Sequence, residues 1–535
     1  MAKTFATAWL SGDPEATDLL PASMRDRAAR AAAVQLAAQR PLDPALLAIL
    51  QRQNAQLPPS PQREANLALL AQPGTVVVVT GQQAGLFLGP LYTLYKAATA
   101  VAAARQLTAE TGAACVPLFW LQTEDHDFAE IDHVLVPRTG APPLTIALAP
   151  SGPSRVPVAH RRLGADVLVA LAELEAQLTG LPHADAVLAL LRAHYAPGVA
   201  VADAFAGTLA ALFAAEGLVF FNPRDAEVAP LVAPFHRACV TDAAVIADLL
   251  ERQADRLRAA GFAPQVHLRP GAPLSFVAPD AVDGPRYRLD PHARPQTWTL
   301  VGHPQHATVT TPQLLDWLAR EPLRFTTSAL SRPLLQDLLL PTAGYVGGPG
   351  EMAYFAQLQP LYRHFATPMP LVIHRDRFAL LDTRTRHFLA GHGLTVADLA
   401  QPRDGVLRRL AAQGAGEAPQ ARLDALMAKL DLAELAREMT ALDPNLAKAV
   451  ARTQDTVREA LAKLLEKHGN AIGQRDRAMA DRLDRARAWL LPEGVAQERV
   501  FGMPGLAARF GIQPLLSAVL SACQPFAGRA QELTL

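Results

Sequence analysis

The sequence predicts an α/β protein with a buried parallel sheet and a separate α-helical coiled-coil domain. Four consecutive valines, Val76–Val79, form the first predicted strand, because a continuous β-branched run is typical of a strand covered on both faces. A helical run over residues 91–107 leads to a second apolar strand, Cys115–Leu121, which completes a β–α–β unit. Residues 446–490 have apolar positions three and four apart, the pattern of a long amphipathic helix.

Length and composition restrict the classes of protein that this chain can be. At 535 residues it exceeds the size at which one hydrophobic core stops growing, so two or more domains are expected. Lys plus Arg and Asp plus Glu number 50 each without a basic stripe, which argues against nucleic-acid binding as the main activity. No signal-peptide pattern and no membrane-length apolar run are visible, so we expect a cytoplasmic protein with no membrane partner.

The segment after the first strand is rich in glycine. Gly81, Gly85 and Gly89 permit tight turns before a helix whose first N–H groups have no partner within the helix. Such a helix start attracts anions, so a phosphate or carboxylate is expected there. The four-residue spacing matches neither the dinucleotide fingerprint nor the P-loop. The residues therefore predict a ligand site of unknown chemistry at the carboxyl edge of the sheet.

Four polar residues, Glu124, Asp125, His126 and Asp127, directly follow the second strand. A right-handed β–α–β connection brings them to the same sheet edge as the glycine-rich segment. Like charges this close are unfavourable unless a cation or a hydrogen-bond network offsets them, so such clusters often mark functional sites. The alternative is a helix N-terminus, where acidic residues are also favoured.

A metal site is a second interpretation of the same region. It uses His126, Glu130 and His133, which fall at helical spacings on one face. The two-histidine metalloprotease motif is missing, and this region alone does not define a third ligand. The three cysteines of the chain are far apart, which fits a reducing compartment and gives no zinc pattern.

Polar residues around the first helix are candidates for ligand contact. Gln82 and Gln83 lie in the glycine-rich segment, where a strand end exposes amides to a ligand. Lys96 could reach back to a bound anion, and the alternative is a solvated lysine on an amphipathic helix. Tyr92 and Thr93 lie on the same helix, and packing is the alternative role for the tyrosine.

Short strands alternate with loops further along the chain. Residues 134–136 and 218–221 are predicted strands. Four more short strands, separated by proline and glycine, predict an antiparallel insertion on the main sheet: Gln265–Leu268, Ser275–Val277, Arg286–Leu289 and Thr297–Val301.

A second dense segment covers residues 328–381. Gly344–Glu351, which includes Gly347 and Gly348, indicates a glycine-rich turn that enters a helix carrying Tyr354. Pro370–Arg375 is a predicted final strand. Its last residue, Arg375, could hold a carboxylate with two hydrogen bonds, or it could pair with a neighbouring residue.

The amphipathic helix over residues 446–490 is too long to be covered by one small domain. At about 1.5 Å per residue it would span roughly 65 Å. Residues 423–439 are the predicted partner within the chain, and the apolar stripe is interpreted as core or dimer interface. Pro492–Gly494 ends the helix, and the apolar tail is expected to return to the core.

Three motifs resemble a known family: Thr80-Gly-Gln-Gln-Ala-Gly85, Gly89-Pro-Leu-Tyr-Thr-Leu-Tyr-Lys96 and Phe119-Trp-Leu-Gln-Thr-Glu-Asp-His-Asp127. Together with residues 331–351, they resemble the bacillithiol biosynthesis cysteine-adding enzymes, the BshC family. The resemblance implies a Rossmann-like parallel-sheet core, similar to class I aminoacyl-tRNA synthetases, with inserted connecting elements and an α-helical coiled-coil domain that forms a homodimer. It implies a core at residues 1–385 with a strand-rich insertion near 262–305, a coiled-coil domain at 386–495 and a C-terminal segment at 496–535 that returns to the core.

The resemblance also implies an activity. Members of the family are assigned the joining of cysteine to glucosaminyl malate through an amide bond, the last step of bacillithiol biosynthesis. A free carboxylate must be activated for this reaction, so ATP or another nucleotide is the candidate cofactor, and no metal site is expected. A metal-dependent hydrolase at residues 124–127 and a non-catalytic coiled-coil dimeric scaffold stay open as alternatives.

The residues expected in the site come from both motif regions. Catalytic roles, binding of the amine or general-base catalysis, are expected for Asp125, His126 and Asp127. Substrate contacts are expected from Gln82, Gln83, Gly89, Tyr92, Thr93, Lys96, Trp120, Glu124, Gln336, Gly347, Gly348, Glu351, Tyr354 and Arg375.

Overall fold

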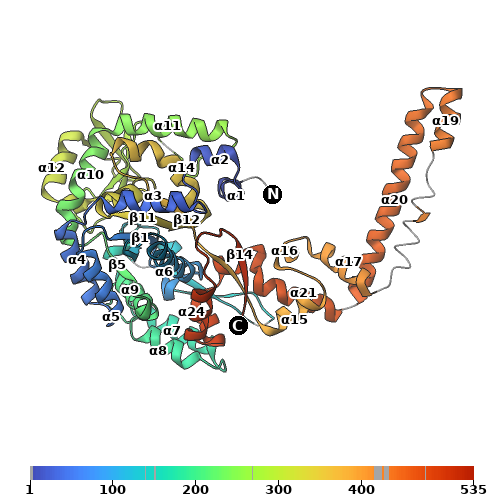
Figure 1. The fold of residues 1–535 in the computed structure, drawn as a ribbon, viewed down its shortest axis with the longest axis horizontal. Coiled ribbons are helices and arrows are strands. Elements are labelled where there is room, and N and C mark those ends of the chain that lie inside the picture. The colour runs from blue at the N-terminus through green and yellow to red at the C-terminus, as the bar shows by residue number, and fades with distance from the viewer. Residues whose placement is uncertain are drawn as a thin grey trace. The chain divides into compact units, whose positions relative to one another are not determined.

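The computed structural model describes residues 4–138, 140–149, 152–267, 269–414, 425–426, 433–475 and 477–535. Its contacts divide the chain into two compact units (Figure 1). The α/β unit contains Met1–Arg138, Pro143–Phe378 and Glu498–Leu533, and the helical unit contains Thr139–Pro142, Ala379–Gln497 and Thr534–Leu535. The C-terminal segment therefore belongs to the first unit, although it follows the second in sequence.

A five-stranded parallel sheet forms the centre of the α/β unit. Its strands, in spatial order, are β12 (Leu371–His374), β11 (Thr342–Gly347), β1 (Val76–Gln82), β2 (Cys115–Leu121) and β5 (Val219–Phe221). The four valines of β1 are completely buried, as expected for the middle strand of a sheet covered on both faces. Four of these strands confirm the sequence prediction.

The strand β11 is not predicted by the sequence. The residues indicate a glycine-rich turn from Gly344 onward, whereas the structure places Gly344 and Gly347 in a buried strand and begins the turn at Gly348. A Cβ atom on Gly344 would lie 2.8 Å from Cδ1 of Ile373 in β12. Glycine is therefore used here for close packing within the sheet, which hides the apolar pattern of a strand.

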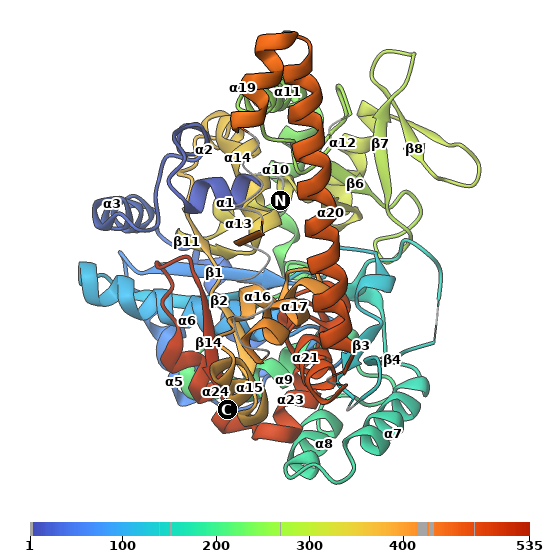
Figure 2. The same ribbon diagram turned by 90° about the vertical axis from the view of Figure 1, so that its right-hand side faces the viewer.

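Two crossovers leave the middle of this sheet in opposite directions. Helix α6 (Tyr92–Thr111) connects β1 to β2, and α14 (Pro349–His364) connects β11 to β12. Because parallel crossovers are right-handed, the two helices cover opposite faces of the sheet, as Figure 2 shows. The strand order thus reverses between β1 and β11. Open α/β sheets bind ligands outside the carboxyl ends of their strands at such a reversal.

Helices at the N-terminus cover part of the sheet. They are α1 (Phe5–Leu10), α2 (Pro14–Leu19), α3 (Arg27–Ala38), α4 (Pro44–Ala55) and α5 (Pro61–Leu70). Prolines at the first position of α4 and α5, with Asp43 and Ser60 as N-caps, explain where these two helices begin. Helix α3 packs against β11 and α4 packs against β5.

The segments after β2 and β5 are mostly helical. They contain the hairpin β3–β4 and five helices: β3 (His133–Val136), β4 (Leu144–Ala147), α7 (Asp166–Leu178), α8 (Ala184–Arg192), α9 (Val201–Leu212), α10 (Ala229–Thr241) and α11 (Ala243–Ala259). The strand β3 confirms the prediction at residues 134–136.

A second, antiparallel sheet lies in the α/β unit. Its strands, in spatial order, are β10 (Phe325–Thr327), β6 (Ser275–Val277), β7 (Tyr287–Pro291), β8 (Thr297–Val301) and β9 (Thr308–Thr310). Three of the predicted strands are confirmed, but the sheet is separate from the main sheet and buries a small core of its own against α12 (Thr311–Arg320). The predicted strand at residues 265–267 is wrong, and Leu268 lies outside the described residues.

The C-terminal segment belongs to the α/β unit. It contains α22 (Gln497–Val500), α23 (Met503–Phe510) and α24 (Ile512–Ala522), with α23 against α8 and α24 against α6. The chain passes between the units within β13 (Arg377–Leu381) and β14 (Ala530–Thr534). Among the described helices, none alone is long and apolar enough to cross a membrane; α23 and α24 meet that criterion only as a pair bent by 104°.

The helical unit contains the predicted amphipathic helix. Its helices are α15 (Thr383–Gly391), α16 (Val396–Leu399), α17 (Arg403–Gly414), α19 (Ala433–Leu442), α20 (Leu446–Arg475) and α21 (Arg477–Leu490). The predicted single helix over residues 446–490 is thus described as α20 and α21, with residue 476 outside the described residues. Both α17 and α19 pack on α20. Of the predicted partner at 423–439, residues 433–439 lie in α19, whereas residues 423, 424 and 427–432 lie outside the described residues.

Candidate active site at the sheet edge

Lys96 joins the two motif regions at the point where the strand order reverses. Its ammonium group donates to the carbonyl of Gly81 at 2.9 Å and to Oε1 of Gln82 at 3.0 Å, and pairs with Oε2 of Glu351 at 2.6 Å. The Lys96 side chain is only 5% exposed. Burial lowers the pKa of Lys96, although Glu351 opposes that effect. With three oxygens in contact, Lys96 acts as a cross-link between the end of β1 and the start of α14.

Glu351 lies in the first turn of α14. The backbone N–H of Gly348 donates to its Oε2 at 2.7 Å, and the hydroxyl of Tyr345 donates to its Oε1. Burial alone would raise the pKa of Glu351, but Lys96 and the Gly348 N–H outweigh burial and lower it. A Cβ atom on Gly347 would lie 3.0 Å from Tyr345 Cε1 and from Glu351 Cβ, so glycine leaves room for this contact.

Arg332, which the sequence reasoning missed, extends this network. Its Nη2 donates to the hydroxyls of Tyr345 at 2.9 Å and Tyr354 at 3.0 Å, and its Nη1 donates to Oε1 of Gln336 at 3.0 Å. Gln336 in turn donates to buried Asp337, whose pKa burial raises to about 6. The signal in the sequence was its place at the start of residues 331–351, which carry part of the family resemblance and begin with the mostly buried helix α13 (Ser331–Leu339).

A second cluster forms around Asp125 and His126. Gln83 Nε2 donates to Asp125 Oδ2 at 2.9 Å, and Arg286 Nη2 donates to Asp125 Oδ1 at 2.8 Å. Arg286 Nε also donates to Nδ1 of His126 at 2.8 Å. Burial alone would raise the pKa of Asp125, but Arg286 and the backbone N–H of His126 lower it. The carboxylate is therefore ionised at neutral pH.

The contact with Arg286 determines the tautomer of His126. A guanidinium group can only donate hydrogen bonds, so Nδ1 accepts and the neutral imidazole carries its proton on Nε2. Burial lowers the pKa of His126, and the positive charge of Arg286 lowers it further. The side chain is 26% exposed. His126 therefore offers a neutral N–H donor, which is a different property from the general base considered from the sequence.

The other members of the acidic cluster do not join this pair. Glu124 is buried and accepts from the backbone N–H and the hydroxyl of Thr327 in β10, so it connects the two sheets. Asp127 is exposed, and none of its described hydrogen bonds uses its carboxylate. Trp120 is completely buried and packs edge-on against Phe221, in the core of the sheet.

Arg375 does not face open space. Its Nη2 donates to Oε1 of Glu498 at 2.7 Å, with both side chains at most 4% exposed. Its guanidinium also lies 5.6 Å from the ring centre of Tyr92. The sequence left open whether Arg375 holds a ligand or pairs with a neighbouring residue, and in the structure its carboxylate partner is Glu498, 123 positions along the chain. Thr93 is buried, and its hydroxyl has no described hydrogen-bond partner.

The start of α6 is closed by the C-terminal segment. The N–H of Leu91 donates to the carbonyl of Phe501 at 2.9 Å, and Pro90 forms a β-bridge with Gly502. Of the three glycines before α6, only Gly89 has a positive φ, 61°, and Gly81 lies within β1. The protein itself thus supplies the acceptor for the Leu91 N–H and covers Pro90, and the anion site at this helix start stays a prediction.

In the described part of the chain, no three His, Cys, Asp or Glu residues are grouped so that they could hold a metal ion. The metal interpretation therefore has no set of ligands there. Glu130 is exposed, and His133 Nδ1 lies 2.8 Å from Oδ1 of Asp132. The histidines of the candidate motif are thus held by different partners, because residues 126–133 form only a short 3-10 turn and a strand start.

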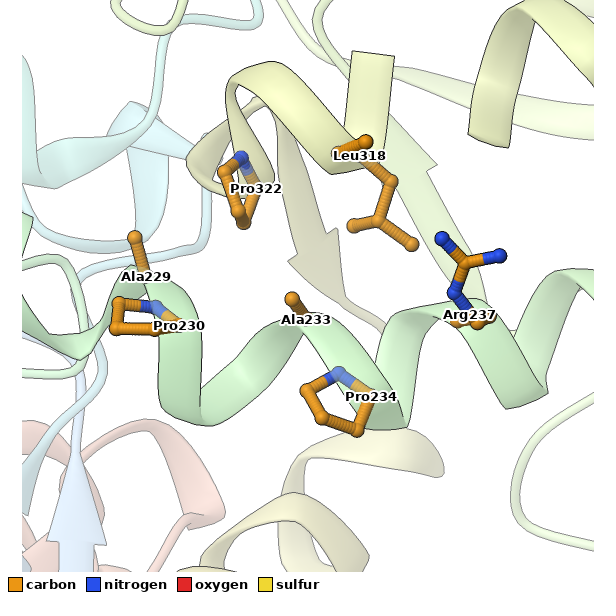
Figure 3. A pocket seen from close by; sticks show the side chains of 8 residues that line it. Ala229, Pro230, Ala233, Pro234, Arg237, Leu318 and Pro322 are labelled. Atoms are coloured by element: carbon orange, nitrogen blue, oxygen red, sulfur yellow. The ribbon is translucent and has the colours of Figure 1, made fainter. Parts of the chain in front are cut away.

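An apolar hollow of about 560 Å³ lies elsewhere in the α/β unit, between α10 and the region of α12 (Figure 3). It is lined by Ala229, Pro230, Ala233, Pro234, Arg237, Leu318, Ala319 and Pro322. Apart from one arginine, its lining offers no group that could donate, accept or transfer a proton through a side chain. We therefore assign the candidate site to the sheet edge.

The fold is that of a Rossmann-like α/β protein with a separate helical unit, and polar side chains gather at the edge of its sheet. Residues 1–376 match the model of the bacillithiol biosynthesis BshC N-terminal Rossmann-like domain, and residues 379–535 match that of the BshC C-terminal coiled-coil domain. The chain belongs to the BshC family.

Relatives of similar length support this assignment. A protein of Salinibacter ruber is 34% identical over 91% of this chain and 88% of its own length, and one of Solibacter usitatus is 33% identical over 90% and 88%. A third, from Geobacillus thermodenitrificans, is 30% identical over 83% and 82%. All three bear the name "Putative cysteine ligase BshC".

Proposed function

We propose that this protein is a cysteine ligase that joins cysteine to glucosaminyl malate through an amide bond, in the last step of bacillithiol biosynthesis. Membership of the BshC family and the names of the relatives support the class of reaction. The observation that carries the proposal is the pair Asp125 and His126, held together by Arg286. It presents an ionised carboxylate and a neutral N–H donor side by side after the carboxyl end of β2, next to the end of β1.

Asp125 is the proposed partner of the reacting amine. Its carboxyl pKa is lowered, so it carries a negative charge at neutral pH, and its side chain is 29% exposed. Oδ1 accepts from Arg286 and from the backbone N–H of His126, whereas Oδ2 accepts from Gln83 alone and keeps an acceptor site for an ammonium group. The amine must lose a proton before it attacks. Asp127, exposed two residues further on, is the proposed acceptor of that proton.

His126 is the proposed donor to the reacting carboxyl group of cysteine. When the amine attacks, a C–N bond forms and an electron pair moves onto the carbonyl oxygen, which becomes negative. A preorganised N–H group stabilises this oxygen more than the neutral carbonyl, which lowers the barrier. When the electron pair returns, the C=O bond re-forms and the activating group leaves with its bonding electrons.

No residue of this chain is assigned to the activating group, which ATP would supply. The buried cations Lys96, Arg332 and Arg375 are each held by carboxylate or phenol oxygens. Among the described residues they do not form a ready cradle for a triphosphate, so the nucleotide enters the proposal only as a condition to test.

The coiled-coil domain is proposed to form a homodimer. Three leucines of α19 and α20 are exposed in the single chain, Leu435 at 46%, Leu442 at 89% and Leu464 at 55%. Exposed large apolar side chains along a helix pair favour association with a second helix pair.

The test is mass-spectrometric detection of the amide product from the purified full chain with cysteine and glucosaminyl malate, with and without ATP and Mg²⁺. We expect product from the wild-type protein and a loss of rate of about 100-fold or more in Asp125→Asn and in His126→Ala. His133→Ala is the matched control, because His133 pairs with its neighbour Asp132 outside the cluster. Absence of product from folded wild-type protein under every condition, or an equal loss in the control, would contradict the proposal.

A further inference from the structure

Arg155 is a cation of the α/β unit without a carboxylate partner among the described residues. Its Nη1 makes one long contact, 3.5 Å, with the carbonyl of Val301, and its guanidinium lies 5.6 Å from the ring centre of Tyr287. By contrast, Arg286 is paired with Asp125 and Arg375 with Glu498. Most of the five N–H donors of Arg155 are thus available to a ligand.

The loop that carries Arg155 is held in place on several sides. Arg161 donates to the carbonyls of Pro153 at 3.1 Å and Val156 at 3.4 Å. The carbonyl of Arg155 accepts from the N–H of Arg286 at 3.0 Å, and Val158 donates to the carbonyl of Asp125 at 2.7 Å. The loop is therefore attached directly to the Asp125–Arg286 pair.

Two backbone features are specific to the placement of this side chain. Arg155 has φ of 67°, which is unfavourable for a residue with a Cβ atom and persists only where the surroundings enforce it. Gly302 approaches the guanidinium so closely that a Cβ atom there would lie 2.4 Å from Nη2 of Arg155. Strained residues of this kind gather at ligand sites.

Arg155 also acts on His126. Its positive charge adds to burial and to Arg286 in lowering the pKa of the imidazole. The backbone hydrogen bond from Arg286 to Arg155 places this loop next to the arginine that holds both His126 and Asp125.

We propose that Arg155 forms a subsite for a carboxylate of the acceptor substrate, the dicarboxylate half of glucosaminyl malate. This inference rests on the proposed function. In a glucosaminyl conjugate the malate is attached to the anomeric carbon, next to the carbon that bears the amine. A carboxylate subsite beside Asp125, the proposed partner of the amine, matches this arrangement of opposite charges.

Calorimetric titration of the full chain tests the subsite with four probes: malate, glucosaminyl malate, cysteine and inorganic phosphate. In Arg155→Gln we expect binding of malate and of glucosaminyl malate to weaken about 10-fold, the effect of losing charge-assisted hydrogen bonds, with cysteine binding unchanged. Arg155→Lys should bind at an intermediate level, because it keeps the charge but not the planar fork. Arg294→Gln, at the tip of the β7–β8 hairpin, removes the same charge and should bind like the wild type.

The outcomes separate the subsite from the proposed function. Product formation with malate binding that is insensitive to Arg155 would overturn the subsite and leave the function in place. Malate binding that depends on Arg155, in a protein that forms no product, would support the subsite and contradict the proposed reaction. Absence of malate binding by the wild type, or an equal loss of cysteine or phosphate binding in Arg155→Gln, would overturn the inference.

Discussion

Arg286 is the residue that joins the proposed reacting groups to the scaffold. It donates to Asp125 and His126 on one side, and to the hydroxyl of Thr326 and the carbonyl of Thr327, both at 3.1 Å, on the other. Its side chain is 5% exposed, so few of its donors are shared with water. A buried guanidinium with a carboxylate partner and several neutral acceptors has a fixed orientation, and it transmits that orientation to both partners.

We predict that Arg286→Gln lowers kcat/KM about 100-fold and moves the acid limb of the pH–rate profile to higher pH. Without Arg286, the pKa values of His126 and Asp125 should both rise, because its positive charge lowers each of them. The imidazole of His126 and the carboxylate of Asp125 would then become protonated at a higher pH than in the wild type. Steady-state kinetics across pH 5–9 measures both effects.

The control for this prediction is Arg288→Gln, two residues along β7. Arg288 pairs with Asp290 on the same strand, 2.8 Å away, and its side chain is 37% exposed. The control should keep the wild-type profile. A uniform drop in rate without a shift of the acid limb in Arg286→Gln would indicate a purely structural role.

The connection from β11 to α14 is the element that carries Glu351 to Lys96. The strand ends at Gly347 and the helix begins at Pro349, so only Gly348 lies between them. A connection this short leaves Glu351 in the first turn of the helix, where its carboxylate can accept from the Gly348 N–H. The missing side chain at Gly347 is what allows Tyr345 and Glu351 to meet.

We predict that Gly347→Ala destabilises the protein by about 1–2 kcal/mol, because a methyl group 3.0 Å from two neighbours must displace them. We also expect kcat/KM to fall, because Glu351 would move away from Lys96. This loss should be larger than the loss of folded protein alone would cause. Urea unfolding and kinetics under the same conditions measure the two effects.

Gly350→Ala is the matched control in the same helix. The nearest atoms to an added Cβ there are 3.9 Å away, so the substitution should be neutral or slightly stabilising. If Gly347→Ala behaved like Gly350→Ala in both measurements, the steric argument for the short connection would be wrong.

At the scale of the whole molecule, segments far apart in the chain build the α/β unit. The end of the chain closes the start of α6 through Phe501 and supplies Glu498 to Arg375. The helical unit is inserted in sequence before that segment returns. In the helical unit, the exposed leucines of α19 and α20 favour association with a second copy of the chain.

We predict that Leu464→Glu shifts the protein from dimer to monomer in light scattering coupled to size-exclusion chromatography, because it places a charge in the proposed apolar interface. Ala462→Glu is the control, since two residues earlier on a helix lies on nearly the opposite side. A monomeric wild type, or an equal effect of the two variants, would contradict the proposed dimer.

Local patterns in the sequence account for much of the fold. The valine run of β1 is confirmed as a buried strand, because β-branched preference and burial act over a few residues. Strand β11 was missed because Gly344 and Gly347 interrupt its apolar pattern. Within the candidate site, Asp125, His126 and Lys96 were identified by their positions after strands or glycine turns.

The sequence by itself determined the fold class, the family and the segments that meet at the sheet edge. Only the tertiary structure decided which residues pair in hydrogen bonds and salt bridges at that edge. Arg286 binds two residues about 160 positions away, and Glu498 takes the arginine that the sequence left available for a ligand. Propensity and periodicity are properties of neighbouring residues, whereas a salt bridge between distant residues exists only after the topology has brought them together and removed the water between them.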